Sequence, residues 1–300
     1  MSIDNFNPIL WSRAFLANLN QKHVHADVMN RNYDGDVQYG QSVKINSIGR
    51  VTVKTYTRNA GAGGTAASPT VTGIDRPEIL QGSALMLTID QQKYFNFEID
   101  DIDKRQQQPK IMNEAMREAA FAMADTIDRF CNQTLQDGVA TSNQLSARTV
   151  GTAPGDFDAY ETMVDLFTVL REANVFDDPW IILPPWYIGM LRKDERFASF
   201  GTAANLEVAK NGLITRVAGF EIRESNNLSG TTSGTLAVSG GAYTILAGVK
   251  AAAAYAEQVD KVEGFRPPDG FNDAMKGLHN YGAKVVRPFA LASCAVTKGT

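Results

Sequence analysis

The sequence lacks the charge balance of a protein built to neutralise nucleic acid. Its 300 residues carry 29 Lys and Arg against 33 Asp and Glu, a formal net charge of -4. A protein that binds DNA through its phosphates needs a clear cationic excess. Any contact with nucleic acid is therefore expected to be loose and independent of base sequence.

Cysteines and long apolar runs are scarce. Cys131 and Cys294 lie in apolar stretches and are predicted to be small buried residues; a disulfide or a nucleophile is the alternative. No segment approaches the roughly twenty apolar residues that span a bilayer. The start "MSIDNFNPIL" also lacks the basic and apolar regions of a signal peptide. We expect a cytoplasmic chain without a membrane partner.

Motifs of known chemistry are missing too. The glycine-rich "AGAGGTAAS" lacks the Lys-Ser/Thr ending of a phosphate-binding loop, and no nucleophile elbow, zinc helix or Cys-x-x-Cys pair occurs. His23 and His25 suggest a metal, but no third ligand follows at a suitable spacing. The sequence therefore predicts no catalytic, cofactor-binding or metal site, and no enzyme.

What the sequence does contain is a long extended segment, "RVTVKTYTRNAGAGGTAASPTVTGI", at residues 50–74. The outgoing strand is predicted from Ser42 to Arg58, with apolar Val51 and Val53 alternating with basic and polar residues. A stretch of Gly, Ala, Ser, Thr and Pro follows, and the return strand is predicted from Ala84 to Asp100. Because an isolated two-stranded ribbon is marginal in water, it must pack on another surface.

Charges of opposite sign flank this segment. An acidic cluster lies at the end of the return strand, and four basic residues lie along the outgoing one. We expect the basic strand of one molecule to contact the acidic patch of its neighbour, with solvated charged loops as the alternative. The predicted contact residues are Lys44, Arg50, Lys54, Arg58, Glu98, Asp100, Asp101 and Asp103.

The remainder alternates helices and strands. A long helix is predicted from Pro109 to Gly138, with an apolar stripe from Met112 to Phe130 and with Asp128 among its solvent-facing residues. From residue 151 an α/β unit follows, in which Asp158 and Glu161 form a capping box. Its strands are predicted at residues 180–183, 219–225 and 242–248, and a closing strand pair at residues 283–297.

This order of parts resembles the major capsid proteins of tailed bacteriophages, which have the Johnson (Hong Kong 97-like) fold. "NGLITRVAGFEIRESNNL" (Asn211 to Leu228) and "NYGAKVVRPFALASCAV" (Asn280 to Val296) look like stretches of that family. The resemblance implies an α+β fold whose parts are an N-terminal arm at 1–38, an extended loop at 39–103, a peripheral domain with a spine helix at 104–150 and 249–300, and an axial domain at 151–248.

The resemblance also implies a function. The chain is expected to assemble in the host cytoplasm into hexamers and pentamers of an icosahedral virion shell around double-stranded DNA, without a cofactor. Expected partners are other copies of the chain, a portal protein, a maturation protease, packaged DNA without sequence preference and, if the sequence is the unprocessed product, a separate scaffolding protein. The alternatives are an encapsulin-type shell around protein cargo and a soluble α/β enzyme with a flap loop.

Overall fold

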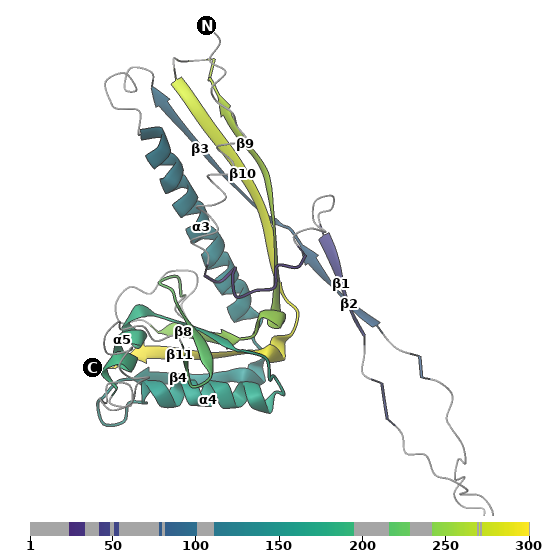
Figure 1. Ribbon diagram of the computed structural model, residues 1–300, viewed down its shortest axis with the longest axis vertical. Coiled ribbons are helices and arrows are strands. Elements are labelled where there is room, and N and C mark those ends of the chain that lie inside the picture. Colours follow the sequence, from purple (N-terminus) through teal and green to yellow (C-terminus); the bar gives the residue numbers. More distant parts are fainter. Residues whose placement is uncertain are drawn as a thin grey trace, which may run out of the picture.

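One long helix and two sheets organise the chain, with a hairpin projecting from their junction (Figure 1). The computed structural model describes residues 24–33, 42–48, 51–53, 78–79, 82–100, 111–194, 216–228, 242–268, 270 and 272–299. The small-residue stretch at 59–72 lies outside these ranges. Within them, no helix is both long and apolar enough to cross a membrane.

The upper unit is a three-stranded antiparallel sheet with the helix α3 along one face (Figure 1). Its strand order is β3–β10–β9, with bounds of Gln91–Asp100, Asn272–Val285 and Ala253–Phe265. Alternate residues of β3, namely Phe95, Phe97 and Ile99, pack toward α3 in the main core. This period of two is what a sheet with one covered face requires.

The helix α3 spans Ile111–Asp137, close to the predicted bounds. Met116, Met123 and Ile127 of the predicted stripe are buried against the sheet. Asp128 was expected to face solvent, and that prediction is wrong, because its side chain is buried and binds His25. The core-facing side of α3 thus includes a buried carboxylate, that of Asp128.

The lower unit is a mixed six-stranded sheet of order β4–β11–β8–β5–β7–β6. Its strands span Gln144–Val150, Leu291–Lys298, Tyr243–Gly248, Trp180–Leu183, Phe220–Glu224 and Arg216–Val217. Helices α4 (Ala159–Glu172) and α5 (Pro185–Lys193) pack on one face, and Leu135 of α3 belongs to the cluster on the other. All four residues of β5 are buried because both faces are covered.

Short 3-10 turns connect these elements, at Thr141–Asn143 (η2), Lys250–Ala252 (η3) and Pro288–Ala290 (η4). The predicted closing strand pair is wrong as a pair. β10 and β11 are both strands, but β10 lies in the upper sheet and β11 pairs with β8 and β4 in the lower one. The predicted domain boundaries at 150 and 248 stay predictions; strands from both sides of them share the six-stranded sheet.

The hairpin consists of β1 (Ser42–Ile48) and β2 (Gly82–Thr88), paired in register from Ser42 opposite Thr88 to Ile48 opposite Gly82. The predicted single return strand is wrong, because the chain changes sheet at Ile89 and Asp90. β2 belongs to the hairpin, whereas β3 pairs with β10. The α+β fold class expected from the sequence is confirmed.

Candidate intersubunit surfaces

The root of the hairpin packs on the chain's own upper sheet. Ile45, Leu87 and Ile89 are buried in a small cluster with Ala254 and Ala256 of β9. Gly282 of β10 makes this approach possible, because a Cβ there would lie 2.2 Å from the carbonyl oxygen of Thr88. The root is therefore held by close packing on one face.

Farther out, the same face of the hairpin has no cover from the described part of the chain. Val51 and Val53 continue the alternation of Ile45 along the sequence. Thr52 lies near Glu78, whose carboxylate accepts from Thr52 N and Oγ1, both at 3.2 Å. Val51, Val53 and Ile79 are 62%, 94% and 88% exposed. Apolar side chains of the same alternation are thus exposed beyond the core that covers the root.

The opposite face of the hairpin carries the one predicted basic residue that the structure describes. Lys44 is exposed on β1, directly opposite Met86 of β2, which is 55% exposed. Arg50, Lys54 and Arg58 lie outside the described residues. The predicted contact of this strand with a neighbour stays a prediction.

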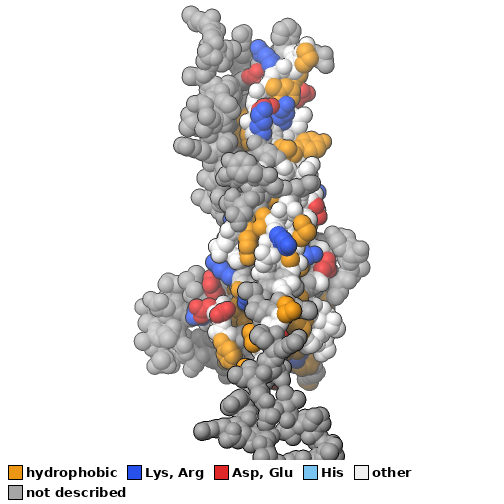
Figure 2. Space-filling view, turned by 90° about the vertical axis from the view of Figure 1, so that its right-hand side faces the viewer, with side chains coloured by type: hydrophobic (Ala, Val, Ile, Leu, Met, Phe, Trp, Pro, Cys, Tyr) orange, Lys and Arg blue, Asp and Glu red, His pale blue; other side chains and the backbone are white. Residues whose placement is uncertain are grey.

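The predicted acidic cluster begins on the outer face of the upper sheet. Glu98 is exposed there and lies diagonal to Lys276, which pairs with Glu263 across the sheet at 3.2 Å. Asp100 ends β3 opposite Asn272, and Asp101 and Asp103 lie outside the described residues. Figure 2 shows charges of both signs mixed with hydrophobic side chains over this upper region. Within the described part of the chain, Lys44 and Glu98 lie in different sheets and form no ion pair.

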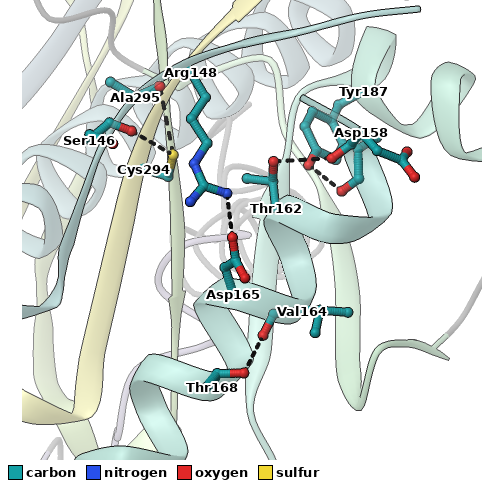
Figure 3. Close-up of polar contacts among 11 residues, drawn as sticks. Ser146, Arg148, Asp158, Thr162, Val164, Asp165, Thr168, Tyr187, Cys294 and Ala295 are labelled. Atoms are coloured by element: carbon teal, nitrogen blue, oxygen red, sulfur yellow. Dashed lines mark hydrogen bonds and ion pairs between the residues drawn. The ribbon is translucent and has the colours of Figure 1, made fainter. Parts of the chain in front are cut away.

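The buried thiol of Cys294 was the remaining candidate for chemistry, and Figure 3 shows its surroundings. Its Sγ lies 3.6 Å from the carbonyl oxygen of Ser146 and 3.7 Å from that of Ala295. Burial raises the pKa of the Cys294 thiol to about 11, even though the Arg148 guanidinium opposes this shift. A thiol that stays protonated at neutral pH is a poor nucleophile. Both cysteines are free and buried, as predicted.

The polar groups around Cys294 instead connect α4 to the sheet and to α5. Arg148 of β4 pairs with Asp165 of α4 at 2.6 Å, and the Tyr187 hydroxyl donates to the carbonyl of Ala159 at 2.7 Å (Figure 3). Burial raises the pKa of Tyr187 well above its usual value, so this hydroxyl keeps its proton. Asp158 caps α4 by accepting from the Tyr160 N–H at 3.3 Å, which confirms the predicted N-terminus.

The histidines do not form a metal site in the described part of the chain. No group of three or more His, Cys, Asp or Glu side chains there is arranged to hold an ion. His25 lies against Asp128 instead, and His23 is outside the described residues.

Comparison with known proteins agrees with this architecture. A family model described as phage capsid protein matches residues 84–293, more than half of the chain. The chain belongs to the phage capsid protein family. No curated protein matches it significantly.

Solved structures give the same result. A structure from Mycobacterium phage Che8 is 29% identical, covers 91% of this chain and 90% of its own, and has a TM-score of 0.68. The capsid of cyanophage P-SCSP1u is 16% identical, with 88% and 85% coverage and a TM-score of 0.63. A virus-like particle from Pyrococcus furiosus, at 12% identity, 97% and 100% coverage and a TM-score of 0.55, shares the fold.

The family defines the general role. This capsid protein is a shell-forming structural component of a phage virion, and the proteins it resembles are structural subunits and not enzymes. The Johnson-type capsid fold that the sequence suggested is therefore confirmed.

Two kinds of residue were not predicted from the sequence, one exposed on the hairpin and one buried in the core. Met86 and Ile79 are exposed on the hairpin, and the alternation of residues around them could have indicated this. Asp128 gave no such signal, because its partner His25 is distant in sequence. Its role depends on the tertiary structure.

Proposed function

We propose that this capsid protein forms the hexamers and pentamers of an icosahedral shell that encloses double-stranded DNA. The observation that carries the proposal is the apolar face of the hairpin, covered at Ile45 and Leu87 but exposed at Val51, Val53 and Ile79. Apolar surface of this kind is stabilised when a partner buries it. In a closed symmetric assembly each copy can supply that partner surface to the next.

Charge supports the cargo half of the proposal. A chain of net charge -4 does not bind DNA tightly, so packaged DNA can move along the inner wall. We also propose that a portal protein, a maturation protease and a scaffolding protein take part in assembly, as the resemblance implies. The contact between the basic strand and the neighbour's acidic patch, Glu98 to Asp103, belongs to the same proposal.

A first experiment tests assembly. The full chain is expressed with and without residues 60–73 and examined by light scattering after size-exclusion chromatography, and by electron microscopy. We expect the deletion variant to fold but to form no normal shells. Wild-type shells from the deletion variant would refute the assembly role of the hairpin.

Charge reversal at Lys54 and Arg58 tests the basic strand, with charge reversal at Lys93 on β3 as the matched control. The loss of assembly should be largest at low salt, where charges are least screened.

A second experiment tests the cargo, because the likeness to the Pyrococcus furiosus virus-like particle favours a shell around protein as the second candidate. Shells from infected cells are treated with nuclease, opened, and analysed for DNA and for co-purified proteins. Protected genome-length DNA supports the proposal. Shells filled with one enzyme and no DNA would favour the encapsulin-type function.

A further inference from the structure

Residues 24–33, which we call the strap, cross from α3 to the hairpin root (dark purple in Figure 1). At the start of the strap, the backbone N–H groups of Val24 and His25 donate to Asp128 Oδ1 at 3.2 and 2.9 Å. His25 Nδ1 lies 2.9 Å from Asp128 Oδ2. Both side chains are buried, so one carboxylate on α3 fixes where the strap begins.

The same carboxylate also holds a loop of the lower unit. Asn227, in the loop 225–228 that follows β7, donates from Nδ2 to Asp128 Oδ2 at 3.1 Å. One helical turn later, Asn132 Nδ2 donates to the carbonyl of Asn227 at 3.0 Å. Leu228 packs in the core cluster of α3. Asp128 therefore joins the strap, α3 and the six-stranded sheet at one point.

The far end of the strap reaches the hairpin. Asn30 N–H donates to the carbonyl of Ala253 at 2.9 Å, and Tyr255 N–H donates to the carbonyl of Asn30 at 3.0 Å. Arg31 forms an ion pair with Glu257 of β9. Tyr33 then packs against the cluster of Ile45 and Leu87 at the hairpin root. The strap thus connects Asp128 to the root of the hairpin.

The chemistry of the junction indicates positioning more than stability. Removing a carboxylate from water is costly, and an apolar side chain could fill the same place on the stripe of α3. A carboxylate with several donors fixes direction, because each hydrogen bond needs a defined geometry. The titratable groups close to Asp128 are His25 on the strap and Cys131 on α3, and the loop contributes the neutral Asn227.

We propose that Asp128 is a positioning residue that acts as a latch, because it holds both the start of the strap and the loop 225–228 on α3. Through the strap, this latch couples the position of the six-stranded sheet relative to the upper sheet to the orientation of the hairpin. When the latch opens, the strap start and the loop 225–228 are released together, and the hairpin root loses the support of Tyr33. The proposal goes beyond shell formation and does not depend on what the shell encloses.

Hydrogen exchange on the unassembled full-length subunit tests the latch, so the result does not depend on assembly. In Asp128→Asn we expect exchange in the strap, in loop 225–228 and in β1 and β2 to rise about tenfold more than exchange in α4 and β5, which follows only the loss of global stability. The matched control is Asp125→Asn, one turn earlier on α3, where a partly exposed ion pair with Arg129 at 2.7 Å is lost. The control should resemble wild type in all segments.

Two results would overturn the proposal. Faster exchange in the strap alone, with the hairpin and the loop unchanged, would show that the segments are independent. An equal rise of exchange in all segments, α4 and β5 included, would show that Asp128 serves general stability alone. If Asp128→Asn does not fold, His25→Gln keeps the carboxylate and removes the imidazole. The strap and the hairpin should then exchange faster together, and an unchanged hairpin would refute the coupling.

Discussion

Replacing Asp128 by Asn should remove a pH-dependent part of the stability of the subunit. Burial alone would raise the pKa of this carboxyl, but the hydrogen bonds and charge of His25, with the amide of Asn227, outweigh it and lower the pKa from 3.8 to about 2. A carboxyl with a lowered folded-state pKa stabilises the fold above its unfolded pKa, and this contribution is lost as the pH falls through the folded value. A difference of this size corresponds to about 2 kcal/mol.

The assay is urea unfolding of the unassembled subunit, followed by circular dichroism at several pH values between 7 and 2. We expect the difference in unfolding free energy between wild type and Asp128→Asn to shrink by about 2 kcal/mol as the pH falls from about 4 toward 2. The Asp125→Asn control should stay within about 0.5 kcal/mol of wild type at pH 7, because its ion pair is partly exposed and isolated i,i+4 pairs contribute little. A wild-type to Asp128→Asn difference that does not change with pH would refute the role of the ionised carboxylate.

Three further predictions concern the hairpin and the thiol. Gly282→Ala should lower the unfolding free energy by about 1–3 kcal/mol, because its Cβ would meet the backbone of Thr88. The control in the same denaturation assay is Gly264→Ala, whose Cβ would have no atom within 4 Å, and equal losses would contradict the close packing. Val53→Asp should change the unfolding free energy of the subunit by less than about 0.5 kcal/mol but abolish shells in electron micrographs. Val53→Thr keeps the side-chain shape and should still assemble. Shells from Val53→Asp would contradict a contact that buries this side chain in the assembly. Cys294 should react with a thiol reagent at pH 7 only after urea unfolding, and rapid labelling of the native subunit would contradict its raised pKa.

Elements with a local signal could be predicted from the sequence. The run "WIIL" is β5, and α4 begins after Asp158, whose side chain accepts from a backbone N–H of the first turn. For α3, a proline and a glycine near the two ends indicated bounds within two residues of Ile111–Asp137. In each case the residues that determine the element lie within it or next to it.

Pairings between distant strands could not be predicted in the same way. β2 and β3 read as one continuous strand, because nothing at Ile89 and Asp90 is a strong turn signal. The change of sheet depends on β10, where Gly282 admits the backbone of Thr88 and Ile89. Likewise, the sequence pattern placed Asp128 among the solvent-facing charged residues of α3, and its burial depends on its contact with His25, 103 residues earlier.

The hairpin shows why a surface can be predicted more easily than its partner. Alternation of apolar and polar residues records that one face is covered, whichever molecule covers it. At Ile45 and Leu87 the cover is the chain's own β9, and at Val51 and Ile79 the described chain offers none, although the pattern is the same. This exposed apolar continuation is the reason for proposing an interface with another molecule at the hairpin. Membership of the phage capsid protein family then makes a second copy of the chain the expected partner.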